Sequence, residues 1–121
     1  MITSNVILRV FRVRHGSNEA TAFTLDVDNR QYIVTARHAV DGLRVSDTID
    51  LFTHGAWSPQ AVQLVGHASG ERDISVLAAD HELTPPRLIM EPTSKGVIYG
   101  QDVYFLGFPY GLLSKFLLTE Y

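Results

Sequence analysis

The sequence predicts an all-β fold, and more specifically a six-stranded antiparallel Greek-key barrel. Hydrophobic side chains recur at every second position through most of the chain, which is the period of a half-buried strand. Turn-forming residues interrupt these runs at short intervals, and no run has the length or pattern of a long helix. Short antiparallel strands without a long helix can close into a small barrel, which fills its interior with side chains and leaves no open edge.

The expected strands are short and are separated by turns. They cover residues 6–13, 23–27, 32–35, 48–52, 61–66 and 74–78. The clearest unit is a hairpin, because its two strands both alternate and Asp28 and Asn29 between them form a turn. After Thr35 the alternation stops, and Asp41-Gly42 ends what we expect to be a single helical turn that carries His38.

The last third of the chain has a different character. Prolines and glycines interrupt residues 80–100 and prevent any long element there. We therefore expect a barrel domain over residues 1–80, a linker over 81–100 and the start of a second, incomplete barrel over 101–121. In that last part, residues 102–106 are expected to form one more strand, which a turn separates from the apolar residues 112–118.

Composition excludes several classes of function. The ten basic and thirteen acidic residues are mixed along the chain and give a net charge of −3, so no basic stripe is available for nucleic acid. The chain has no cysteine, which excludes disulfides, thiolate catalysis and cysteine zinc sites within it. The short apolar run at the N-terminus is interrupted by arginines, so we expect no signal peptide, no membrane contact and a cytoplasmic location.

His38 and Asp73 are the candidate catalytic residues. His38 follows a buried-looking strand on a tight turn, and Asp73 directly precedes another apolar run, where a carboxylate needs water or a hydrogen-bonding partner. A carboxylate that fixes the tautomer of a histidine makes it a better general base. The alternative, a structural histidine and a turn-forming aspartate, is the commoner case for such residues and stays open at this point.

The other histidines carry a weaker signal. His15 and His54 lie beside glycines in turns, His67 ends a strand, and His81 lies in the linker. None of them forms a His-x-His or His-x-x-x-His pair, so we expect neither a metal nor another cofactor.

Four segments in the same order carry a resemblance to a known family. They are residues 20–25 (Ala-Thr-Ala-Phe-Thr-Leu), 33–40 (Ile-Val-Thr-Ala-Arg-His-Ala-Val), 72–77 (Arg-Asp-Ile-Ser-Val-Leu) and 100–111 (Gly-Gln-Asp-Val-Tyr-Phe-Leu-Gly-Phe-Pro-Tyr-Gly). The chain resembles the trypsin-like (chymotrypsin-fold) serine peptidases, particularly bacterial enzymes of the high-temperature-requirement type. The second and third segments are similar to the family's segments around the triad histidine and aspartate, and the fourth to the one that opens its second barrel.

This resemblance implies a role for each candidate residue. His38 would act as general base and then general acid, and Asp73 would orient it. The complete protein would hydrolyse peptide bonds in a protein or peptide substrate, and residues 81–100 would join its two barrels. Ala39 stands where secreted animal enzymes of the family have a half-cystine, which implies a disulfide-free bacterial type.

The family's nucleophile segment is missing from this sequence. No Gly-x-Ser-Gly-Gly occurs, and Ser75, Ser94 and Ser114 are not followed by the glycines that let backbone N–H groups converge on an oxyanion. We therefore expect the chain to be the N-terminal half of a serine peptidase, with its nucleophile beyond Tyr121, and to be inactive on its own.

A second hypothesis is a barrel of degenerate peptidase ancestry that binds protein without catalysis. The apolar side chains over residues 102–118 would have no second barrel to cover them. Exposed apolar strands pair with other strands, so this hypothesis predicts self-association through residues 102–118, by swapping or by edge pairing.

Overall fold

The computed structural model of the chain describes residues 4–85, 89–103 and 106–107. Its strands are β1 (Val10–His15), β2 (Asn18–Val27), β3 (Arg30–Thr35), β4 (Ser46–Thr53), β5 (Ala56–His67) and β6 (Ser75–Ala79). A one-turn helix, α1 (Ser4–Ile7), precedes β1, and a 3-10 turn, η1 (Arg37–Val40), lies between β3 and β4. The all-β prediction is confirmed.

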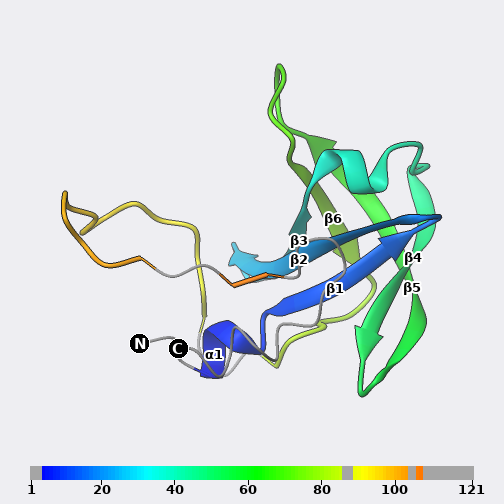
Figure 1. Cartoon of the computed structure of the whole chain (residues 1–121), viewed down its shortest axis with the longest axis horizontal. Coiled ribbons are helices and arrows are strands. Elements are labelled where there is room, and N and C mark those ends of the chain that lie inside the picture. Colours follow the sequence, from blue (N-terminus) through cyan, green and yellow to red (C-terminus); the bar gives the residue numbers. More distant parts are fainter. Residues whose placement is uncertain (1–3, 86–88, 104–105, 108–121) are drawn as a thin grey trace.

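The strands close into an antiparallel barrel in the order β1-β2-β3-β6-β5-β4 (Figure 1). After β3 the chain crosses the barrel, and β4 pairs with β1 rather than with β3, so that Val13 lies opposite Leu51. The first four strands therefore lie in the spatial order β4-β1-β2-β3, which is the Greek-key arrangement. β6 closes the barrel by pairing with both β3 and β5, and every strand has two neighbours.

The core consists of the side chains that point into the barrel. Its buried hydrophobic members are Val13, Ala22, Ile33, Val40, Ile49, Leu51, Val62 and Leu77. The alternation in the sequence explains which side chains are buried. In β4, for example, Ile49 and Leu51 are buried, whereas their neighbour Thr48 points the other way and is exposed. Val40 comes from η1 and is 1% exposed, so the core also holds the turn that carries His38.

The predicted hairpin of β2 and β3 is present with its expected turn. Asp28 and Asn29 have φ values of 49° and 64°, and a two-residue turn of type I′ requires positive φ at both positions. Asn and Asp tolerate this conformation better than other side chains do. A two-residue turn of the same kind joins β4 to β5, where His54 and Gly55 both have positive φ.

Several boundaries differ from the prediction. The strand expected over residues 6–13 begins only at Val10, because the N–H groups of Leu8 and Arg9 bond back to the carbonyls of Ser4 and Val6 and extend the helical turn. β5 begins at Ala56, five residues earlier than expected. The turn between β4 and β5 contains only His54 and Gly55, and Pro59, which was expected to lie in a loop, is part of the strand. The strand expected over 102–106 is absent from its described residues, 102, 103 and 106. Residues 108–118 lie outside the described part.

The segment after β6 is partly docked rather than a simple linker. Thr84 is 1% exposed, and its hydroxyl lies 2.9 Å from the hydroxyl of the buried Thr24. Asp26 and Met90 exchange two hydrogen bonds of 2.8 Å, one of them to the Asp26 carboxylate. The same carboxylate oxygen receives Nη2 of Arg9 at 2.7 Å, and Arg9 is 1% exposed. Beyond Glu91 the chain extends away from the barrel, in yellow and orange in Figure 1.

Within the described part of the chain, no helix is both long enough and apolar enough to cross a bilayer.

Candidate functional site

The turn η1 presents His38 to solvent at one end of the barrel. Thr35 ends β3, and the N–H of Ala39 donates to the carbonyl of Ala36 at 3.2 Å, which holds the turn. Ala39 and Val40 are buried, whereas the His38 side chain is 72% exposed. The buried neighbours therefore fix the backbone of His38 while its ring faces outward.

Asp73 lies in the loop between β5 and β6, at the same end of the barrel (Figure 1). The N–H of Ala68 donates to the carbonyl of Ile74 at 2.9 Å and closes this loop at its base. β6 pairs with β3 so that Ser75 lies opposite Thr35. Because His38 follows Thr35 by three positions and Asp73 precedes Ser75 by two, the pairing brings the two candidate residues together.

Asp73 holds His38 at two points. Its Oδ1 accepts the backbone N–H of His38 at 2.8 Å, and its Oδ2 is hydrogen-bonded to ring nitrogen Nδ1. The two contacts fix both the position of the histidine backbone and the orientation of the ring. A neutral ring that donates from Nδ1 carries its lone pair on Nε2, the nitrogen suited to accept a proton from a further group.

The carboxyl group of Asp73 is kept ionised by these contacts. The hydrogen bond from the backbone N–H of His38, and after it the one from the ring, hold the pKa of Asp73 below its ordinary value. The side chains of His38 and Asp73 are 72% and 51% exposed, so water screens their attraction. The contact therefore orients the two side chains but adds little to the stability of the fold.

The remaining histidines have other surroundings. Nε2 of His15 lies 3.8 Å from Asp47, His81 contacts its neighbour Asp80, and His54 occupies the β4–β5 turn. His67 was expected only to end a strand, but its Nδ1 lies 2.6 Å from Oγ of Ser75. The sequence signal that could have revealed this contact is Gly66, because a glycine inside a strand often marks a bulge.

Residues 106 and 107 return to the barrel beside Asp73. Together with Phe23, Val34 and Ile74, Leu106 and Gly107 line a mostly apolar cavity of about 320 Å³, of which Asp73 forms part of the wall. The chain thus leaves the barrel after Glu91 and comes back next to the candidate site.

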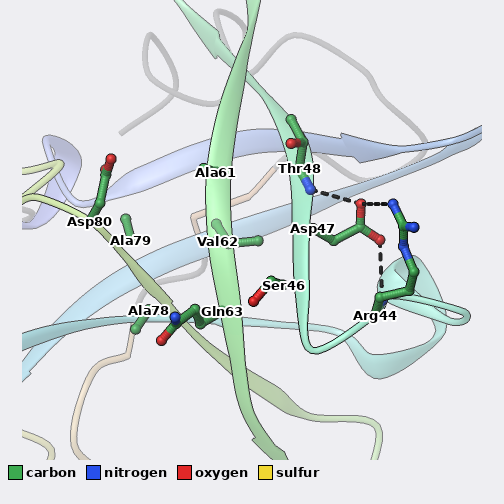
Figure 2. Close-up of a pocket in the computed structure, with 10 residues that line it drawn as sticks. All are labelled: Arg44, Ser46, Asp47, Thr48, Ala61, Val62, Gln63, Ala78, Ala79 and Asp80. Atoms are coloured by element: carbon green, nitrogen blue, oxygen red, sulfur yellow. Dashed lines mark hydrogen bonds and ion pairs between the residues drawn. The ribbon is translucent and has the colours of Figure 1, made fainter.

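A hollow of about 490 Å³ on β4, β5 and β6 contains neither candidate residue. Figure 2 shows Asp47 at one edge, turned toward Arg44 and Thr48 and away from Ala78, Ala79 and Asp80. The N–H groups of Arg44 and Thr48 donate to Asp47 at 3.1 and 2.8 Å and lower its pKa to about 2. Asp47 is thus an ionised carboxylate whose oxygens are already hydrogen-bonded to its neighbours, and the hollow contains no histidine–carboxylate pair comparable to His38 and Asp73.

The arrangement at His38 is chemically suited to a general base. A histidine whose Nδ1 is held by a carboxylate can take a proton at Nε2, and the carboxylate stabilises the imidazolium that results. In the described part, no group of three or more His, Asp or Glu side chains is suited to hold a metal ion. Comparisons of this chain with models of known protein families, with curated proteins and with solved structures give no match.

Proposed function

We propose that this chain supplies the histidine and the aspartate of a trypsin-like serine peptidase. His38 acts as general base toward a serine hydroxyl and then as general acid toward the leaving amine, and Asp73 orients it. The observation that carries the proposal is the two-point contact of Asp73 with the backbone N–H and Nδ1 of His38. The closed barrel supports it, because it joins two residues distant in sequence at the end of adjacent strands.

In this proposal the nucleophile is a serine outside the described residues. Ser75 is the serine nearest Asp73 in sequence, but it is completely buried and its hydroxyl contacts His67 rather than His38. The return of Leu106 and Gly107 beside Asp73 favours a nucleophile that is delivered by a following part of the protein. The substrate class is a protein or peptide.

Covering the pair is a necessary part of this function. His38 and Asp73 are both largely exposed in this chain, and water weakens every electrostatic contact at the site. A second structural unit that excludes water would strengthen the contact between the two residues and would supply the N–H groups that stabilise an oxyanion. The barrel alone is therefore expected to be inactive.

The proposal is tested by labelling the protein, expressed from its own gene, with a fluorophosphonate, which reacts with activated serines. We expect the rate of labelling to fall by at least about 10⁴-fold in both His38→Ala and Asp73→Asn. His81→Ala is the matched control, because His81 is also exposed and hydrogen-bonded to an aspartate but lies away from the site. Absence of labelling in the parent protein, or equal labelling of His38→Ala, would contradict the proposal.

A second candidate function is a barrel that binds protein without catalysis. It is favoured by four exposed hydrophobic side chains on the arm that leaves the barrel, Val97, Ile98, Tyr99 and Val103. The predicted self-association through residues 102–118 rests mostly on residues outside the described part. Light scattering of the chain and of an Ile98→Asp variant would support this candidate if a dimer of the parent became a monomer in the variant. A monomeric parent would count against it.

A further inference from the structure

His67 and Ser75 form a partly buried polar contact at the base of the loop that carries Asp73. Ser75 is 0% exposed, and its Oγ lies 2.6 Å from Nδ1 of His67. A buried hydroxyl is costly unless it is hydrogen-bonded, so the ring of His67 meets a requirement of the fold at this position. The rest of the His67 residue remains exposed at the rim of the barrel.

This contact depends on a β-bulge in β5. Leu64 lies opposite Leu77 of β6, but Gly66 then lies opposite Val76, so the register shifts by one residue at Val65. A slip of one residue exchanges the two faces of a strand. Without the bulge, Gly66 would lie opposite Ser75 and no side chain would reach the hydroxyl. The bulge places His67 opposite Ser75 instead.

Ser75 also connects the two strands that carry the candidate residues. On its other side it lies opposite Thr35 of β3, whose hydroxyl donates to the carbonyl of Thr21 at 3.0 Å. A polar row therefore runs through Thr35, Ser75 and His67 across three neighbouring strands. His38 follows the first member of this row by three residues, and Asp73 precedes the second by two.

We infer that His67 and Ser75 are positioning residues for Asp73. Their hydrogen bond, the bond from Ala68 to Ile74 and the pairing of β5 with β6 all lie at the base of the loop that carries Asp73. With this base fixed, the two carboxylate oxygens of Asp73 meet the backbone N–H and Nδ1 of His38 together. Ser75 is not the nucleophile, because its hydroxyl has no access to solvent or substrate.

The inference rests on the proposed function for its effect on catalysis, but its structural content can be tested on this chain without a reaction. Three variants are compared with the parent by NMR. His67→Leu removes the hydrogen-bonding ring, Ser75→Ala removes the hydroxyl, and His67→Asn keeps a polar group near the place of Nδ1. His81→Leu is the matched control, because it removes another exposed histidine with an oxygen partner at 2.6 Å.

Two signals report on Asp73 through its partner: the hydrogen exchange of the His38 backbone N–H and the ring nitrogen shifts of His38. We expect His67→Leu and Ser75→Ala to speed the exchange by at least about tenfold and to change the Nδ1 signal. The amide of Ala22 in the core should keep its exchange rate, and His67→Asn should restore the His38 signals.

Unchanged His38 signals in His67→Leu would overturn the inference. Hydrogen exchange that becomes faster by the same factor at His38 and at Ala22 would also overturn the inference, because it would indicate a general loss of stability. His67→Leu changes a residue at the rim and keeps the test valid if Ser75→Ala does not fold. Asp73→Asn separates the two proposals. If this variant leaves the His38 signals unchanged, Asp73 does not contact His38 in solution, and the proposed function is contradicted.

Discussion

Removing the guanidinium of Arg9 tests whether a buried ion pair fastens the segment after β6 to the barrel. The side chains of Arg9 and Asp26 are 1% and 11% exposed, and Nη2 lies 2.7 Å from Oδ2. Arg9→Met keeps most of the side-chain length but leaves the Asp26 carboxylate without its cation. Breaking a buried pair by removing one partner costs about 3–5 kcal/mol. A domain of this size unfolds with about 5–15 kcal/mol, so the variant should lose a large part of its stability.

The pH dependence of this loss gives a second, independent test. Burial by itself raises the pKa of Asp26, but the N–H of Met90 and the Arg9 guanidinium outweigh burial and place the pKa below the ordinary value of 3.8. In the parent, this carboxylate therefore stabilises the fold above that value, and its contribution is lost as the pH falls through the lower folded pKa. In Arg9→Met burial acts without the guanidinium, the folded pKa rises, and protonation relieves the buried charge. The difference between variant and parent should therefore shrink as the pH falls.

Urea unfolding followed by the fluorescence of Trp57, the only tryptophan, measures both effects. We expect a loss of about 3–5 kcal/mol near pH 7, corresponding to a melting temperature at least about 12 °C lower, and a smaller loss near about pH 4.5. Arg44→Met is the control, because the Arg44 side chain is 81% exposed beside Asp47, and its midpoint should stay unchanged. A loss below about 1 kcal/mol in Arg9→Met, or a loss that grows on acidification, would refute this reasoning.

Three further predictions concern the core, the partly buried carboxylate of Asp47 and a turn. Leu77→Ala opens a cavity at a completely buried position and should cost about 2–5 kcal/mol in urea unfolding; a cost below about 1 kcal/mol would contradict the packing. The Asp47 pKa of about 2 means that this group stabilises the fold above 3.8 and loses its contribution as the pH falls toward 2, so Asp47→Asn should lack this part of the acid transition, as measured by circular dichroism. Asn29→Val places a β-branched residue at φ 64° and should cost about 1–2 kcal/mol in thermal unfolding, whereas an unchanged melting temperature would argue against the type I′ turn.

The architecture was predictable because side-chain alternation and turn chemistry act locally. Residues 23–27 and 32–35 alternate on either side of Asp28 and Asn29, and the structure confirms the hairpin. The single helical turn after Thr35 was predictable for the same reason, since the alternation stops and Asp41-Gly42 follows. The start of β1 was mispredicted, because Val6 and Ile7 are apolar enough for a strand, and only the hydrogen bonds back to Ser4 and Val6 determine a helical turn.

The sequence suggested His38 and Asp73 as candidates, but their arrangement could not be predicted from it. The positions of His38 and Asp73 beside apolar runs identified them as candidates, whereas their contact depends on the pairing of β3 with β6, which are far apart in sequence. The contact of His67 with Ser75 depends on a one-residue bulge, and alternation cannot place a bulge within a strand that is exposed on one face. The docking of Thr84 and Met90 was not predictable because both residues lie next to or between prolines that indicate a linker, Pro85, Pro86 and Pro92.

The fold preserves the geometry of the His38–Asp73 pair although both side chains are largely exposed. The pair is held by backbone anchors on both sides, namely the buried Val40 after His38 and the buried Ser75 after Asp73, and not by burial of the charges themselves. Largely exposed charges carry only a small desolvation cost, so the arrangement forms without a further compensating charge. The same exposure weakens the contact, because the field of Asp73 at the ring is screened by water. A structural unit that covers the pair would therefore strengthen the electrostatic attraction between Asp73 and the His38 ring without changing their positions. For this reason the catalytic proposal requires a covering unit and no rearrangement of the barrel.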